Sequence, residues 1–338
     1  MKSFWEDICR AARATGVLVA TLVGAGYATG REMSQYFGEA SWATLILAAV
    51  LIALFSMAFL YVGAKGGERR GKLFKVYEVG LSVLAVVSCG VMVAAGKALL
   101  SGAWTALVIA LVGVLICLTD KVFHAANVAA VPILLLLVAV VAFRAPSVAV
   151  GTAFLPLSAA NYAGMNLLFE GELLRREGEG MRPRAILMAG VGIAVCMGLL
   201  LCAMHGVVGA SPSELPFADA ADAMGLSALA TGVILLSVLT SIAGGMRVAL
   251  TVWCERIPQS VAALLALLVA LLVAVIPFAT LVRYVYPVLG WLGVAVVVVY
   301  TAIAVYALTK GRVRGDKRPV WRRSAGGFGQ KLGKKGEY

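Results

Sequence analysis

The residues best suited to chemistry lie in one glycine-rich stretch near the N-terminus. Gly24, Gly26 and Gly30 interrupt an apolar run, and Arg31 and Glu32 follow directly. A glycine in a helix interior costs about 1 kcal/mol relative to alanine, and charge is costly at membrane depth. Irregular backbone survives there only where protein buries it or where it lines a cavity. The stretch predicts a broken helix at a binding site. Close packing of small residues is the alternative for Gly26 and Gly30, but it leaves the charges unexplained.

A helix that restarts at this break would present unpaired amides, which bind a carboxylate without a cationic side chain. A second segment, Leu155–Asn166, holds Pro156 and Gly164 and predicts a matching interruption. The expected substrate-binding residues come from these two segments: Gly24, Ala25, Gly26, Tyr27, Asn161, Tyr162 and Asn166.

Three hydroxyl side chains farther along the chain predict an ion site. Ser237, Thr240 and Ser241 stand at i, i+3 and i+4 and therefore share one helix face. Neutral oxygens suit a hard monovalent ion, and carbonyls near Ala20 and Val23 would face a small cation. The alternative is that these hydroxyls bond only to their own helix.

Acidic residues in apolar surroundings are candidate proton carriers, because burial penalises their charged form. Glu32 and Glu170 are the two candidates for proton coupling. Glu172 lies two positions after Glu170, so the two side chains point to different helix faces. At least one of Glu170 and Glu172 is expected to pair with Arg175 or Arg176. Glu32 is expected to pair with Arg31 or Lys97.

The composition identifies an integral membrane protein. Of the 338 residues, 62% are hydrophobic and 14% are charged, with a mean hydropathy of +0.95; a soluble domain is about 45–50% apolar and 25% charged. The net charge is +12, but the basic residues lie mainly in the loops and form no single patch, which argues against nucleic acid as a partner. The six cysteines form no C-x-x-C pair, and two histidines supply no catalytic cluster. We expect no enzyme activity, no cofactor and no metal beyond a monovalent ion.

Ten apolar runs are long enough to span a bilayer, which requires about 17–25 helical residues. They cover residues 14–30, 40–64, 79–96, 98–119, 122–143, 145–169, 185–213, 223–246, 257–282 and 284–309. With the N-terminus in the cytoplasm, alternating spans place most of the 29 Lys and Arg residues inside. Both termini are therefore expected in the cytoplasm, and Tyr284, Tyr286 and Trp291 at the outer interface or an outer gate.

Ten spans divide into two halves of five with opposite orientations, as in transporters built from inverted repeats. The predicted organisation is a cytoplasmic N-terminus at 1–13, five-helix repeats at 14–144 and 145–309, and a basic cytoplasmic tail at 310–338. The predicted fold class is an all-α polytopic membrane protein with discontinuous helices 1 and 6.

Four motifs resemble the YkvI-type family of bacterial membrane proteins: Gly24–Phe37, Met92–Gly96, Asn166–Leu168 and Tyr286–Gly293. The resemblance covers most of the chain up to about Leu308. That family is placed in the amino acid–polyamine–organocation superfamily, which implies a LeuT-like fold. In sodium-coupled relatives, carbonyls before the break and hydroxyls on the eighth helix hold sodium. The resemblance places that site at Ala20, Val23, Ser237, Thr240 and Ser241.

Together these features predict a secondary transporter in the bacterial cytoplasmic membrane, coupled to sodium and carrying a small organic solute such as an amino acid or amine. The expected partners are that solute and the lipid bilayer. Two alternatives stay open. One is a proton-coupled transporter that uses Glu32 or Glu170; the other is a non-transporting membrane sensor on the same fold.

Overall fold

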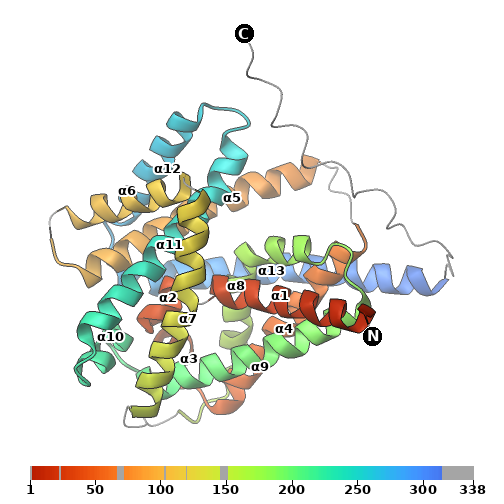
Figure 1. Ribbon diagram of the computed structural model, residues 1–338, viewed down its shortest axis with the longest axis horizontal. Helices are drawn as coiled ribbons and strands as arrows, with labels where there is room; N and C mark the ends of the chain where they lie inside the picture. The colour runs from red at the N-terminus through yellow and green to blue at the C-terminus, as the bar shows by residue number, and fades with distance from the viewer. Residues whose placement is uncertain are drawn as a thin grey trace.

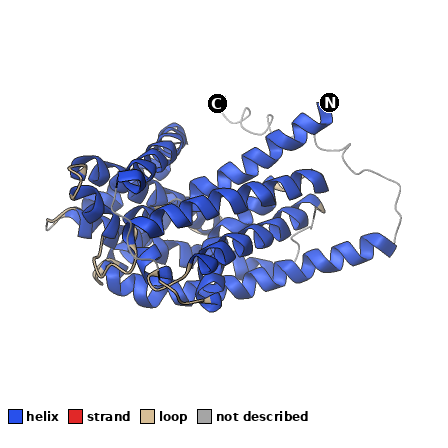
Figure 2. Ribbon diagram, turned by 90° about the horizontal axis from the view of Figure 1, so that it is seen from below, coloured by secondary structure: helices blue, strands red, loops and turns tan. Residues whose placement is uncertain are grey.

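The computed structural model describes residues 2–22, 24–66, 72–102, 104–118, 120–144 and 151–313. These residues are almost entirely α-helical (Figure 2). The helices are α1 (Lys2–Leu22), α2 (Ala25–Thr29), α3 (Arg31–Phe37), α4 (Trp42–Ala64), α5 (Lys72–Leu99), α6 (Thr105–Leu118), α7 (Asp120–Arg144), α8 (Pro156–Glu177), α9 (Pro183–Val208), α10 (Pro216–Asp222), α11 (Ser227–Trp253), α12 (Gln259–Val273) and α13 (Phe278–Val313). The predicted all-α fold class is confirmed for the described residues, and the tail beyond Val313 lies outside them.

Five helical segments are long and apolar enough to cross a membrane: Trp42–Ala64, Val76–Leu99, Pro183–Val208, Ser227–Trp253 and Phe278–Thr309. Three apolar segments are shorter: Thr105–Leu118, Pro132–Arg144 and Gln259–Val273. The structure is therefore compatible with a multi-pass membrane protein. α1 and α8 fall outside both groups and carry several charged residues each.

Most of the long helices pack into two groups. One group contains α1, α4, α8, α9 and α13, with α8 packed against α4 and α13. The other contains α5, α6, α11 and α12, in which α11 packs along α5 and α6. Figure 1 shows the second group at the upper left of the bundle, while α7 crosses in front of it at a steep angle. The short helices α2 and α3 connect α1 to α4 and contact both groups.

The first predicted span is broken, as its glycines indicate. α1 ends at Leu22, and α2 restarts after Gly24, whose backbone is extended. A second change of direction occurs at Gly30, where φ is +75°. Only glycine adopts this left-handed conformation at little cost. The first apolar run, residues 14–30, is thus divided between α1 and α2, and the predicted discontinuity of helix 1 is confirmed.

The predicted interruption of helix 6 is wrong between Pro156 and Asn166. α8 is continuous from Pro156 to Glu177, with Pro156 in its first turn, where a missing N–H costs nothing. Gly164 lies inside this helix because α13 crosses there: a Cβ at Gly164 would overlap the backbone carbonyl of Gly290. Likewise, a Cβ at Gly293 would overlap the carbonyl of Gly164. Here Pro156 marks the start of α8, and Gly164 marks the close crossing of α8 and α13.

Candidate functional site

Glu32 is the buried acid at the centre of the broken segment. It lies in the first turn of α3 and is only 6% exposed. Its carboxylate rests against the bare Cα of Gly26, since a Cβ built there would overlap the Glu32 side chain. Tyr286 of α13 makes a side-chain hydrogen bond with the same carboxylate. Gly26 is therefore needed to make room for an acid that joins the break to α13.

The predicted ionic partners of Glu32 are wrong. The guanidinium of Arg31 donates to the carbonyl oxygens of the loop between α9 and α10, with the shortest bond, 2.8 Å, to Ser213. Lys97 is exposed near the end of α5. Among the ion pairs of the described residues, none includes Glu32. Arg31 instead holds the loop between α9 and α10, because its Nη1 lies within hydrogen-bond distance of three successive carbonyl oxygens.

Glu170 is a second buried acid and faces the first from α8. It is 7% exposed, and its carboxyl group interacts with the Thr21 hydroxyl near the end of α1, which itself donates to the Val17 carbonyl at 2.8 Å. Its other oxygen, Oε2, has no hydrogen-bond partner within the described chain. Glu170 and Glu32 lie close enough to interact electrostatically. The two acids thus form a seam between the broken segment, α8 and α13, and we call Glu32, Glu170, Thr21 and Tyr286 the acidic seam.

Aromatic rings border the acidic seam. The Tyr162 ring lies edge-on to Tyr36, with centroids 5.3 Å apart, and edge-on to Phe37 at 5.0 Å. Tyr36, Tyr162 and Tyr286 all interact electrostatically with Glu32. Tyr27, in contrast, uses its hydroxyl to bind the carbonyl of Leu200 on α9, at 2.8 Å. The Tyr36 hydroxyl likewise donates to the Met165 sulfur at 3.5 Å. Tyr27 and Tyr36 are thus committed to packing, and Tyr286 contributes to the site.

The two predicted substrate-binding asparagines bond mainly to backbone. Asn161 donates to the carbonyl of Pro287 on α13 at 2.9 Å, and Asn166 donates to the carbonyl of Tyr162 at 2.8 Å. Both side chains are buried on α8. Asn161 therefore ties α8 to α13 at their crossing, while Asn166 lies one turn from Glu170 on the same helix.

The break also meets the hydroxyl-bearing face of α11. A Cβ at Gly24 would lie 2.9 Å from the Ser241 Oγ. Thr240 donates to the carbonyl of Ser237 at 3.1 Å, whereas the Ser237 Oγ is buried without a partner in the described chain. Ala20 lies in the last turn of α1, where carbonyls lack intrahelical partners. Val23 lies outside the described residues. Gly24 thus approaches Ser241, while the Thr240 hydroxyl bonds to its own helix, as the alternative for these residues expects.

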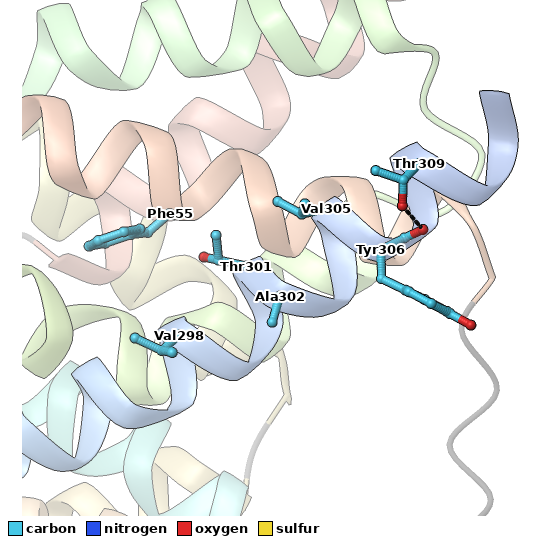
Figure 3. A pocket seen from close by; sticks show the side chains of 7 residues that line it. All are labelled: Phe55, Val298, Thr301, Ala302, Val305, Tyr306 and Thr309. Carbon is cyan, nitrogen blue, oxygen red and sulfur yellow. Dashed lines mark hydrogen bonds between the residues drawn. The ribbon is translucent and has the colours of Figure 1, made fainter.

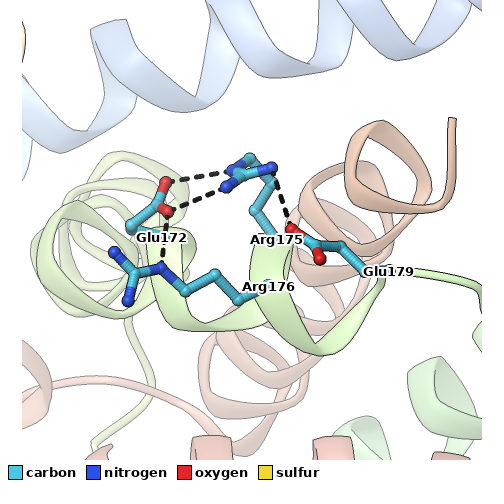
Figure 4. A network of polar contacts seen from close by, with 4 residues as sticks. All are labelled: Glu172, Arg175, Arg176 and Glu179. Atoms are coloured by element: carbon cyan, nitrogen blue, oxygen red, sulfur yellow. Dashed lines mark hydrogen bonds and ion pairs between the residues drawn. The ribbon is translucent and has the colours of Figure 1, made fainter. Parts of the chain in front are cut away.

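The C-terminal end of α8 carries a network of charged side chains (Figure 4). Glu172 accepts from both Arg175 and Arg176 at 3.2 Å, which confirms the predicted pairing, and Arg175 lies 3.7 Å from Glu179. The same turn reaches α1 through ion pairs Arg13–Glu177 at 2.8 Å and Asp7–Arg182 at 3.8 Å. The start of α1 and the turn between α8 and α9 therefore lie at one end of the bundle.

A groove on the surface between α4 and α13 is chemically different from the seam. It has a volume of about 580 Å³ and is lined by Phe55, Val298, Thr301, Ala302, Val305, Tyr306 and Thr309 (Figure 3). The lining is mostly apolar, and none of the predicted site residues borders it. The groove suits a hydrocarbon chain and supplies no group that could couple an ion to a solute.

Two members of the acidic seam, Tyr286 and Thr21, could not be identified from the sequence. Tyr286 was expected at the outer interface or an outer gate; it is 2% exposed and bonds to Glu32, while Tyr284 and Trp291 are exposed. Thr21 shows no special pattern in the sequence beyond its place before the glycine stretch. The chain matches no known family model, and no curated protein shows significant similarity to it.

Proposed function

We propose that this chain is a cation-coupled secondary transporter of a small organic solute. The supporting observation is the break between Leu22 and Ala25, where Gly24 meets Ser241 of α11 and Gly26 meets the buried Glu32 of α3. A protein that only needed to be stable in a bilayer would have little reason to keep unpaired polar groups there. The proposal includes ten membrane spans in two inverted halves. It also places the protein in the bacterial inner membrane, with both termini in the cytoplasm.

Sodium is the proposed coupling ion. The unpartnered Ser237 hydroxyl, the Thr240 hydroxyl and the carbonyl oxygens at the end of α1 offer neutral oxygen ligands. Such ligands suit a monovalent hard cation, whereas a divalent ion would call for carboxylates. The site lies between the two packing groups, so an occupied site would hold α1 against α11.

The experiment is a thermal-shift titration of the purified chain with sodium chloride against choline chloride. Sodium is expected to stabilise the wild type by about 1–3 kcal/mol near saturation, through binding to the folded state. Thr240→Ala should abolish the sodium-specific shift. Thr251→Ala is the matched control: it removes an exposed hydroxyl of α11 that bonds only to its own helix. An unchanged sodium response in Thr240→Ala would refute this ion site.

Proton coupling is the second candidate, and the acidic seam favours it. Two buried acids without an ionic partner in the described chain are suited to exchanging protons with either side of a membrane. In proteoliposomes, a pH gradient without sodium should then drive uptake of the solute found by thermal shift. Glu32→Gln or Glu170→Gln should remove that response, whereas dependence on sodium alone would exclude this candidate.

A further inference from the structure

The groove between α4 and α13 takes no part in the proposed coupling of an ion to a solute. It opens away from the bundle, because two of its lining residues, Val298 and Val305, are 60% and 53% exposed. We propose that this groove binds an acyl chain of an anionic phospholipid, whose headgroup lies beside Lys65. Such a lipid site requires a multi-pass membrane protein and is independent of the transport activity.

The length of the groove matches one leaflet of a bilayer. Its lining on α13 runs from Val298 to Thr309, which is about 17 Å of helix. Thr309 is also the last residue of the apolar segment of α13, and Phe55 lies near the middle of the apolar segment Trp42–Ala64. Because the hydrocarbon core of a bilayer is about 30 Å thick, the groove reaches from the middle of the membrane to one surface. A single acyl chain covers the same depth.

α4 and α13 run in the same direction along the groove. The centroids of the Phe59 and Tyr300 rings lie 4.2 Å apart, and Val62 packs with Ala304 about one turn farther along both helices. Lys65 follows directly after α4. The same register therefore brings Lys65 to the end of the groove at which both apolar segments end.

The walls of the groove offer a ligand carbon atoms rather than hydrogen-bond donors. The Thr301 Oγ1 is buried, so this residue presents mainly its carbon atoms to the groove. The Thr309 hydroxyl donates to the Tyr306 carbonyl at 2.9 Å and is thereby bonded to its own helix (Figure 3). A polar molecule in the groove would lose its hydrogen bonds to water without replacement. The groove therefore suits a hydrocarbon chain, and a polar headgroup has to lie beyond one of its ends.

Lys65 determines which end receives the headgroup. Its side chain is exposed, its ammonium group lies 5.4 Å from the centroid of the Tyr61 ring, and it forms no ion pair among the described residues. The opposite end, at Phe55 and Val298, lies in mid-membrane, where a charged headgroup would be costly. A lysine at a membrane surface attracts anionic lipids. The favoured ligand is thus a phospholipid with a net negative charge.

The test separates the headgroup from the acyl chain. The purified full chain is freed of lipid in detergent, and native mass spectrometry measures binding of phosphatidylglycerol, phosphatidylcholine and glycerol phosphate. One phosphatidylglycerol per chain should bind about fivefold more tightly than phosphatidylcholine, since one lysine near the surface contributes about 1 kcal/mol. Glycerol phosphate, which has no acyl chain, should not bind.

Two variants and two matched controls locate the lipid. Ala302→Trp fills the groove and should weaken binding of both phospholipids by about tenfold or more, whereas Ile303→Trp alters the next residue, which is 46% exposed outside the lining, and should bind as the wild type does. Lys65→Gln should make the two phospholipids bind equally. Arg283→Gln is its control, because Arg283 lies over the Tyr284 ring at 5.6 Å near the opposite end of α13.

Three outcomes would overturn the inference. Equal losses in Ala302→Trp and Ile303→Trp would show that lipid covers α13 without a specific site. Equal binding of both phospholipids by the wild type would remove the role of Lys65. Absence of bound lipid, with a dimer that Ala302→Trp dissociates, would show that the groove holds a second copy of the chain. Lys65→Gln, at an exposed position, still tests the headgroup if Ala302→Trp fails to fold.

Discussion

The contact between Gly26 and Glu32 makes a quantitative prediction for Gly26→Ala. Helix propensity alone would stabilise α2 by about 1 kcal/mol. The added Cβ, however, would overlap the Glu32 carboxylate and move it away from Tyr286. Loss of a hydrogen bond to a charged group costs about 1.5–3 kcal/mol, and overpacking costs about 1–3 kcal/mol. We expect a net loss of about 2–4 kcal/mol in the free energy of unfolding.

A double-mutant cycle separates this cause from a general effect on the helix. In a Glu32→Ala background the carboxylate that the new Cβ would overlap is absent, so Gly26→Ala should be neutral or stabilising. The coupling energy between the two positions should reach about 2 kcal/mol or more. Equilibrium unfolding in mixed micelles measures all four variants. Gly16→Ala is the control, because a Cβ at Gly16 meets nothing within 4 Å. An equal effect of Gly26→Ala in both backgrounds would refute the reasoning.

Three further predictions follow from the packing and the charge network. Gly164→Ala should prevent α8 and α13 from meeting and cause loss of folded protein on size exclusion, whereas Gly232→Ala, in open space on α11, should behave as the wild type. Arg175→Gln should lower the unfolding free energy by about 3 kcal/mol because Arg175 is buried beside Glu172; Arg13→Gln, at a 73% exposed side chain, should cost less than about 1 kcal/mol. Removal of the residues after Val313 should leave sodium binding intact, and loss of that binding would favour the sensor alternative.

The fold class and the break in the first span could be predicted from the sequence because both depend on local composition. Long apolar runs identify helices directly, and three close glycines weaken one of them. The turn between α5 and α6 is similarly visible, since Gly102 occurs where α5 has just ended. The pairing of Glu172 with Arg175 and Arg176 follows from helical spacing alone.

The continuity of α8 could not be predicted, because Pro156 and Gly164 have two structural meanings. Proline can break a helix or begin one, and glycine can weaken a helix or admit a neighbouring backbone. Only the position of α13 decides between them. The pairing of Glu32 with Tyr286 joins residues far apart in sequence, and the orientation of Arg31 toward Ser213 depends on where α9 ends. Such pairings arise from tertiary packing and carry no local pattern.

Main-chain contact between α8 and α13 restricts how the protein can move. At Gly164 and Gly293 no side chain separates the two helices, so sliding would force peptide groups into one another. α8 and α13 should therefore move as one rigid body together with α4, which packs against both. The groove between α4 and α13 would then keep a constant shape whenever these three helices move together.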